Sequence, residues 1–441
     1  MSSSFSKNLE IYNAKQFKES VSEPASSNVY LTFGKTVAWA NDLDPDISNT
    51  SIPSFYEVWS NMIGGKRVTG NNIKHAIPRF DWTANSAYYA YDDRIDSLEL
   101  MNGNNAFYVI TDDWNVYKCL ANNYGAVSTE KPTSTSTTSH FQTSDGYIWK
   151  YMTTLTAEEK LRFSSYDYIP IKTLALNDGT TQWTVQQDAV DGAIHTVLLS
   201  HFGNNYTTNN ISIVITGDGS DANAYAVRNV TSNTISSILV DTKGYGYTYA
   251  NVIIVSDTGS NAAARAIISP PGGHGSDPIS ELGGSYLMLS INLNASEDDK
   301  LIVNNEFRQI ALIEDPVYYS SSNVIGNSVF NQLTKISLSG TSAEYVEDEW
   351  VYQGSSYANA SFKAIVTTWD SPNNILRLSN VEGVPNNDIL VGNTSTAGRF
   401  VNSIQNPDGK TNSGKLLYIN NIEPITRDPD QTESFQIVLK F

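Results

Sequence analysis

Closely spaced aspartates are the first residues here that could do chemistry, because carboxylate oxygens are preferred ligands of calcium. Asp42, Asp44 and Asp46 repeat the spacing of the first half of a calcium-binding loop. Such a loop requires glycine at its sixth position and glutamate at its twelfth, where this chain has Ile47 and Pro53. The segment is therefore typical of a solvated acidic loop.

Turn aspartates offer a second place where a cation could bind. Asp218, Asp221 and Asp257 each lie within two positions of a glycine of a turn. An aspartate in such a position usually hydrogen-bonds to the backbone of its own turn, and that interpretation competes with a cation site. We therefore predict that the chain has no metal ligand. A cation bound at one of these turns stays open as the alternative.

The histidines do not have the spacing of metal ligands. Only His274 has a possible co-ligand within one helical turn, Asp277, and both lie in a segment rich in proline and glycine where no helix would hold them on one face. We therefore interpret all five histidines as ordinary surface or strand residues and predict no cofactor. They are His75, His140, His195, His201 and His274.

Signatures of catalysis are missing from the sequence, which has no HExxH motif, no Walker loop and no nucleophile elbow. Gly244 and Gly246 match part of a dinucleotide-binding fingerprint, but its third glycine is absent. We expect no catalytic residue. Paired carboxylates for glycoside cleavage stay open as an alternative, because the two acids can come from distant strands. Acid-rich runs of the kind that are usually solvated are Glu158-Glu159, Asp298-Asp299 and Glu347-Asp348-Glu349.

The elements that would have to position such residues are mostly strands. Only two segments near the start have helical periodicity, 13–23 and 54–63, and we expect Ser54 and Glu57 to form a capping box at the second. Short β-branched or aromatic runs bounded by turn residues predict strands elsewhere. The clearest of these runs are 29–33, 106–110, 116–120 and 147–153.

Composition limits the class of protein. The chain has 441 residues, with 28 Lys and Arg against 46 Asp and Glu, and a formal charge of −18. Such acidity repels phosphate, so we expect no nucleic-acid partner. The apolar runs are far shorter than the roughly 20 residues that span a bilayer, and the N-terminus lacks a secretory signal, so we expect no membrane insertion. Cys119 is the lone cysteine, which fits folding in a reducing cytoplasm.

An internal repeat occupies residues 194–266. The Gly-x-x-Tyr-Thr motif that starts at Gly203 recurs at Gly244, and each copy continues through a strand and a Gly-Ser turn into a strand with alternating alanines. Two copies packed together can bury surface that one copy cannot. We expect Tyr206 and Tyr247 to have equivalent environments, each packed against the base of its own copy.

A second β segment spans about residues 323–401. Its predicted strands are short and closely spaced, at 349–352, 364–368, 375–378 and 389–391. Strands of this length and spacing suit a small antiparallel barrel or sandwich.

Seven blocks that occur in order along the chain carry a family resemblance. The most specific block runs from Ala76 to Trp82, and we expect Trp82 to pack in the N-terminal core. Family-matching positions are Ile77, Pro78, Arg79, Asp81, Trp82, Gly146, Tyr147, Trp149, Phe307, Arg308, Gln309, Asp430, Gln431, Thr432 and Glu433. Together these blocks resemble the baseplate wedge subunit of T-even-type contractile-tailed bacteriophages, the gene product eight family.

The resemblance implies a mostly β fold, with a multi-layer β-sandwich core, two short helices and inserted small antiparallel β modules. It also implies a structural component of the tail baseplate of a virion, made in the host cytoplasm and acting by protein–protein assembly without catalysis. The implied partners are a second copy of the chain, forming a homodimer, and other baseplate wedge proteins. The alternative is a tail-associated protein that binds or degrades glycans of the host surface.

The matching blocks fall outside the two β segments, which therefore look like insertions into surface loops. On this interpretation the core consists of residues 1–184, 283–319 and 411–441. A tandem repeat module occupies 185–282, and a small barrel or sandwich module occupies 320–410.

Overall fold

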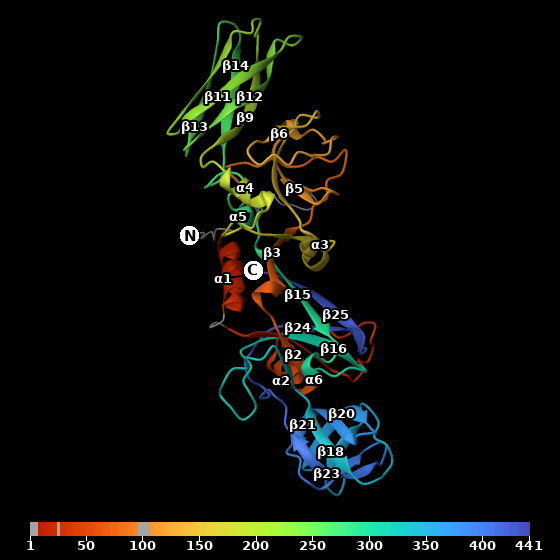
Figure 1. Ribbon diagram of the computed structural model, residues 1–441. Coiled ribbons are helices and arrows are strands. Elements are labelled where there is room, and N and C mark those ends of the chain that lie inside the picture. The colour runs from red at the N-terminus through yellow and green to blue at the C-terminus, as the bar shows by residue number, and fades with distance from the viewer. Residues whose placement is uncertain (1–7, 24–26, 96–105) are drawn as a thin grey trace, which may run out of the picture. The chain divides into compact units, whose positions relative to one another are not determined.

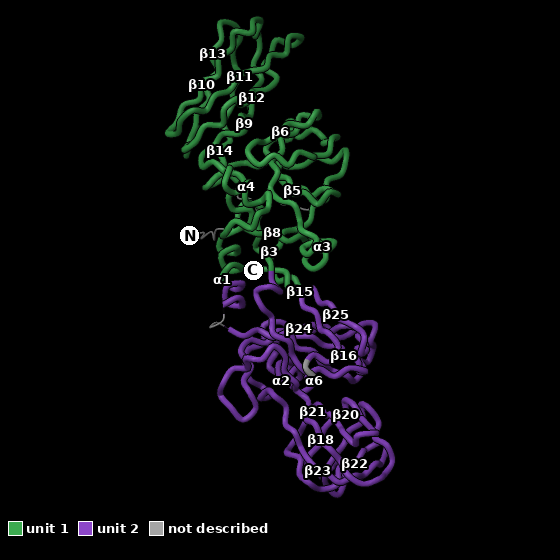
Figure 2. The backbone as a smooth tube through the Cα atoms, viewed as in Figure 1, with its two compact units in different colours: residues 1–16, 74–289, 437–441 green, residues 17–73, 290–436 purple. Residues whose placement is uncertain are grey.

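The structure is a computed structural model that describes residues 8–23, 27–95 and 106–441 (Figure 1). The chain forms two compact units (Figure 2). One contains residues 1–16, 74–289 and 437–441, and the other contains residues 17–73 and 290–436. Strands dominate both units, so the prediction of a mostly β fold is confirmed. Among the described residues, no helix is long and apolar enough to cross a membrane.

The helices are short, apart from the first. The helix expected at 13–23 begins earlier, at Asn8, and the helix expected at 54–63 is also present. The α-helices are α1 (Asn8–Ser22), α2 (Ile52–Asn61), α3 (Ala157–Phe163), α4 (Thr181–Gln187), α5 (Pro278–Glu281) and α6 (Glu297–Lys300).

The N-terminus of α2 differs from the prediction. Its N-cap is Ser51, whose hydroxyl accepts a hydrogen bond from the Ser54 backbone N–H. Pro53 lies in the first turn, where a helix does not need the missing N–H. The expected capping box of Ser54 and Glu57 is therefore wrong.

The unit of residues 17–73 and 290–436 is built on a five-stranded antiparallel sheet. Strand β1 lies at its centre and is buried along its whole length. Val58 and Trp59 of α2 pack into the same buried cluster as Tyr30 of β1, so the helix covers apolar surface of the sheet. In spatial order the strands are β17 (Val329–Asn331), β2 (Met62–Arg67), β1 (Val29–Gly34), β16 (Asn305–Glu314) and β24 (Lys415–Arg427).

The same unit contains a closed six-stranded antiparallel barrel. Of the two arrangements expected for this β segment, the structure has the barrel. Its interior is filled by small and aliphatic side chains, including Ala364, Val366 and Leu378. The strands in barrel order are β18 (Thr334–Ser339), β21 (Ile375–Gly383), β20 (Phe362–Asp370), β19 (Trp350–Gln353), β22 (Ile389–Gly392) and β23 (Gly398–Gln405).

The other unit contains a four-stranded sheet whose two long strands, β5 and β7, are paired through most of their length. Strands β3 (Ile73–Pro78) and β8 (Tyr168–Ile171) form a further antiparallel pair. The chain passes between the units within β15 (Tyr286–Asn294) and β25 (Thr432–Lys440). In order, the strands of the four-stranded sheet are β4 (Tyr108–Ile110), β5 (Asn115–Asn122), β7 (Tyr147–Thr154) and β6 (Phe141–Gln142).

The internal repeat forms one six-stranded sheet in which the two copies exchange strands. The third strand of each copy pairs with the first strand of the other copy, and the two middle strands pair with each other, with Val214 opposite Ile253. Neither copy therefore forms its own sheet. In order, the strands are β13 (Ala250–Ser256), β10 (Ile211–Gly217), β11 (Ser220–Asn229), β12 (Thr234–Tyr245), β9 (Ile194–Asn204) and β14 (Ser260–Ile268).

The exchange of strands changes what the repeat tyrosines contact. Tyr206 and Tyr247 are 3% and 5% exposed, so the expected equivalence of their environments is confirmed. Their rings lie against Gly259 and Gly219 respectively, which belong to the Gly-Ser turn of the opposite copy. The expectation that each ring packs against the base of its own copy misses this contact with the opposite copy.

Gly219 provides a test of this packing. A Cβ atom at this position would lie 2.5 Å from the Tyr247 ring, so Gly219→Ala should force the ring to move and destabilise the fold by about 1–3 kcal/mol. Denaturant unfolding measures this change in free energy. Gly326→Ala is the control, because its Cβ would meet nothing within 4 Å. Equal stability of the two variants would contradict the packing.

Candidate functional site

The predicted acidic loop is only partly solvated, because one of its aspartates is bound by an arginine. The Arg308 guanidinium donates from Nε and Nη2 to the two carboxylate oxygens of Asp42, at 3.0 and 2.9 Å. This hydrogen bonding lowers the pKa of Asp42. The backbone carbonyl of Asp46 accepts from the side chain of Asn421 on β24. The loop thus holds the edge of the five-stranded sheet.

The turn aspartates fix contacts between the two repeat copies. Asp218 accepts hydrogen bonds from the backbone N–H groups of Thr248 and Tyr249, and with the Thr248 hydroxyl these lower its pKa to about 2. Asp257 accepts from the side chain of Asn210 in the first copy. Across the part of the chain that the structure describes, no group of three or more His, Cys, Asp or Glu residues is arranged to hold a metal ion.

The acid-rich runs are held in place by other groups. Glu159 forms ion pairs with Lys74 and Lys172, at 3.2 Å each. Glu349 is buried and accepts from the backbone N–H groups of Thr394 and Ser395. The side chains of the run at 298–299 lie outside the described residues. Glu159 and Glu349 are thus structural, whereas the exposed Glu347 and Asp348 line a surface pocket together with Glu306.

The first family-matching block builds the end of β3. Ile77 is fully buried, and the Pro78 carbonyl accepts from the Tyr108 hydroxyl at 2.7 Å. Arg79 binds both carboxylate oxygens of Asp81, with Nη2 to Oδ1 at 2.9 Å. Trp82 packs against the aromatic cluster of the four-stranded sheet but is only half-buried. It therefore lies at the edge of that core.

The remaining family-matching residues lie on other strands. Gly146 turns the chain with φ +86° before β7, where the Tyr147 and Trp149 rings stack with centroids 5.4 Å apart. Gln309 of β16 donates to the side chain of Asn421, and the buried Glu433 carboxylate accepts from Arg427 Nε at 2.9 Å. Phe307 is buried, while Asp430, Gln431 and Thr432 form or adjoin the turn before β25. These residues are distributed over several strands and shape the fold.

A buried group of basic side chains lies between β5 and α5. Lys118 is 0% exposed, and its Nζ donates to Glu281 Oε2 at 2.8 Å and to His274 Nδ1 at 3.0 Å. Because an ammonium group can only donate, the Nδ1 of His274 accepts and its ring proton lies on Nε2. The other Glu281 oxygen accepts from the backbone N–H groups of Gly275 and Asp277. Two of the three ammonium N–H groups and both carboxylate oxygens thus have hydrogen-bond partners, which stabilise a buried charge pair.

Two more histidines extend this group toward the repeat sheet. The Nδ1 atoms of His140 and His195, the latter on β9, are 3.0 Å apart, so one ring donates and the other accepts. The ring centroids of His195 and His274 are 5.3 Å apart. Lys150 on β7 donates to the backbone carbonyl of Thr137. We call Lys118, His140, Lys150, His195, His274 and Glu281 the buried basic cluster.

Burial sets the titration of the buried basic cluster. It lowers the pKa of each of the three histidines, and nearby basic groups lower it further. Burial also lowers the pKa of Lys150 to about 8, an effect to which Lys243 adds. The pKa of Lys118 is lowered by burial, while the Glu281 carboxylate opposes the change. The histidines are therefore neutral at pH 7.

Sequence reasoning missed this cluster, and the interpretation of all histidines as ordinary surface or strand residues is wrong for His274, which is buried in a loop. Its six members come from separate segments and form no motif. Asp277, the suspected co-ligand of His274, instead caps α5 by accepting from the Ser280 N–H. One signal was available, because Lys118 and Lys150 each interrupt an apolar strand, where a lysine needs a buried partner.

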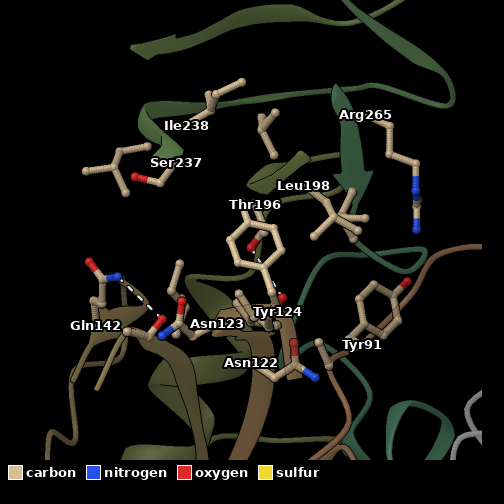
Figure 3. A pocket seen from close by; sticks show the side chains of 18 of the residues that line it. Tyr91, Asn122, Asn123, Tyr124, Gln142, Thr196, Leu198, Ser237, Ile238 and Arg265 are labelled. Carbon is tan, nitrogen blue, oxygen red and sulfur yellow. Dashed lines mark hydrogen bonds between the residues drawn. The ribbon is translucent and has the colours of Figure 1, made fainter. Parts of the chain in front are cut away.

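A cleft lies where the four-stranded sheet meets the repeat sheet (Figure 3). Its volume is about 340 Å³, and its lining comes from β5, β7, β9, β12 and β14 and the segments beside them. Figure 3 shows the Tyr124 ring in the middle of the cleft, with Tyr91 and Arg265 on one side and Gln142 on the other. Tyr91 also touches the buried basic cluster, because Lys118 Nζ lies 4.2 Å from the centre of its ring.

The protein is thus rich in β-strands, and the charged clusters among its described residues hold strands and turns together. A comparison with known protein families finds no match. Over 207 residues the chain is 24% identical to the baseplate wedge protein gp8 of Enterobacteria phage T4. The similar region covers 38% of this chain and 61% of the T4 protein, so the chain spans less than two thirds of that relative. This distant similarity supports a baseplate-related family.

The buried basic cluster makes stability depend on pH. The histidine pKa values are lowered in the folded state, so below the unfolded value of about 6.5 the unfolded chain binds more protons, and stability falls as the pH falls. His195→Gln should reduce proton uptake on unfolding by about half a proton at pH 6.5 and by about one proton at pH 5. Denaturant unfolding across this pH range measures the slope of the unfolding free energy against pH.

The exposed His201, on the same strand, provides the matched control. His201→Gln should leave the pH slope close to that of the unchanged protein. A His195→Gln slope equal to that of the control would show that His195 is not held neutral by its surroundings.

Proposed function

We propose that this protein is a structural component of a phage tail baseplate wedge that acts through protein–protein contacts and without catalysis. The observation that carries the proposal is the similarity to the T4 baseplate wedge protein. The roles of Glu159 and Glu349 support it, because their carboxylates bind lysines and backbone N–H groups. The proposed location is the tail baseplate of the virion, after synthesis in the host cytoplasm.

Other wedge proteins and a second copy of this chain are the proposed partners, with no role for nucleic acid or for insertion into a membrane. A contractile tail works through surfaces, and the repeat sheet supplies exposed apolar side chains for such contacts. Val214 and Ile253 face each other across β10 and β13 and are 42% and 49% exposed.

We also propose that residues 185–282 and 320–410 are modules inserted into the core. The two ends of the repeat sheet lie side by side, since the Ser269 N–H donates to the Ala193 carbonyl at 2.9 Å. The ends of the barrel segment are equally close, since the Asp408 N–H donates to the Asn331 carbonyl at 2.9 Å. Adjacent ends are what insertion into a loop requires.

Purified virions test the proposed function directly. Mass spectrometry should detect the chain in isolated tails, and a cryo-EM map of the intact tail should contain it in the baseplate wedge. Absence of the chain from purified tails would contradict the proposal. Shortening of host envelope polysaccharide by the purified protein would contradict the non-catalytic part and favour the glycan-degrading alternative.

The proposed homodimer is tested by sedimentation. A two-fold interface uses the same patch on both copies, and obligate dimers usually bury more than about 2,000 Å². The chain at micromolar concentration should therefore sediment as a dimer. A monomer at that concentration, in the absence of wedge partners, would contradict an obligate dimer.

Deletion tests the insertion of the repeat module. Replacing residues 194–268 with a Gly-Ser bridge should leave a soluble chain that still unfolds cooperatively, because Ala193 and Ser269 are already hydrogen-bonded neighbours. Circular dichroism and thermal melting measure this outcome. Loss of soluble protein would place the repeat in the core of the fold. A folded variant that no longer enters wedges would identify the module as an interaction element.

A further inference from the structure

We propose that the cleft between the four-stranded sheet and the repeat sheet binds a neutral oligosaccharide. This inference goes beyond the wedge function, because it concerns a ligand and not a structural contact. Its volume of about 340 Å³ falls within the range of small-ligand sites. Such sites combine apolar and aromatic walls with a few polar groups that orient the ligand.

Apolar and aromatic surface lines the cleft on two sides. Ile148 belongs to β7, while Leu198 and Ile238 come from β9 and β12 of the repeat sheet. The rings of Tyr91 and Tyr124 add flat aromatic surface (Figure 3). The C–H face of a pyranose ring packs on an aromatic ring while its hydroxyls remain free for hydrogen bonds.

The Tyr124 ring is held in the cleft by an unusual backbone. Asn123 and Tyr124 are consecutive left-handed residues, with φ of 45° and 58°, and such a conformation costs energy for residues other than glycine. The Asn122 side chain caps the turn by accepting from the Gly125 N–H at 3.2 Å. An edge contact with Phe202 of β9, centroids 5.2 Å apart, fixes the ring from the other side. The ring is therefore presented in one position while 47% exposed.

Neutral polar groups surround the rings. Asn123 and Gln142 line the cleft, and each uses its amide nitrogen in a hydrogen bond to a backbone carbonyl. Among the described contacts, their amide oxygens remain as acceptors. Thr196 and Ser237 contribute hydroxyls from the repeat sheet. Amide oxygens and hydroxyls match the donor and acceptor character of sugar hydroxyl groups.

The charges that line the cleft neutralise each other. Arg265 donates from Nη2 to Asp92 at 2.5 Å and from Nη1 to Asp93 at 2.6 Å. Of the described residues that line the cleft, Asp92 is the sole carboxylate and Arg265 the sole cation. Hydrolysis of a glycoside needs two carboxylates, so this site would hold a sugar without cleaving it. A charged ligand would find no unpaired counter-charge there.

A peptide strand is a poorer occupant than a sugar. Strands β5, β9 and β12, which line most of the cleft, are each paired on both sides. Their backbone groups are therefore not available to bind an added strand, which is how extended peptides usually gain affinity from a sheet. Recognition along these three strands must come from side chains, which suits a saccharide.

Isothermal titration with maltotriose, cellotriose, mannotriose and chitotriose tests the proposal on the full chain. At least one of these neutral trisaccharides should bind, and Tyr124→Ala and Gln142→Ala should each weaken that binding at least tenfold. Tyr249→Ala is the matched control, because this tyrosine is 58% exposed and does not line the cleft. It should leave the affinity unchanged.

Three results would overturn the proposal. The first is that none of the four sugars binds at 10 mM. The second is that a sugar binds but Tyr124→Ala and Gln142→Ala leave its affinity unchanged. The third is that an anionic heparin tetrasaccharide binds more strongly than every neutral sugar. Thermal melting of each variant separates loss of the ligand from loss of the fold. Gln142→Ala changes an exposed side chain on an edge strand, so it keeps the test valid if Tyr124→Ala unfolds.

Discussion

The ammonium group of Lys118 can stay in the interior only because Glu281 and His274 complete its hydrogen bonds. Removing one member of a buried charge pair costs about 3–5 kcal/mol, since the other charge is left without a partner. The native state must therefore bring β5 and α5 together. The segment that leaves the repeat sheet is fixed by the same contacts, and His195 on β9 then packs beside His274. One ion pair thus sets how the repeat sheet lies on the four-stranded sheet.

The two copies of the repeat meet segments outside the repeat sheet through different residues. Arg265 in the second copy binds Asp92 and Asp93 outside the repeat. The equivalent position of the first copy, one residue before the last matching alanine, holds Tyr225, which is 51% exposed. Two copies with matching turns have therefore diverged at this position, where only the residue of the second copy binds residues outside the repeat. A duplicated element can become specific in this way while its own fold stays symmetric.

Local patterns predicted the elements well and their partners poorly. The strand expected at 147–153 is β7, nearly to the residue, because an aromatic residue at every second position is a pattern that depends only on neighbours in sequence. The cap of α2 was misplaced because Ser51 and Ser54 are both good N-caps and Pro53 decides between them. The competing N-caps lie within a few residues of each other, so the choice between them can be predicted from the local sequence.

Contacts between distant segments could not be predicted in the same way. The repeat indicated two stacked copies, but its spacing is the same whether each third strand pairs within its own copy or with the other copy. His140 and His195 are 55 positions apart, and neither carries a local signal of the other. Only the lysines in apolar strands marked the site at all. The candidate site is therefore a product of topology, which one sequence does not encode in short motifs.

The exchange of strands in the repeat has a consequence for synthesis on the ribosome. When residue 229 has emerged, the first copy is complete in length, yet β9 and β11 still lack the strands that flank them, β12 and β14. The open edge of β11 can pair once β12 has emerged, but one edge of β9 stays open until residue 268 has left the exit tunnel. Open edges are templates for pairing with other chains. On crowded polysomes, nascent chains at this stage are the form of the protein most exposed to mispairing with one another.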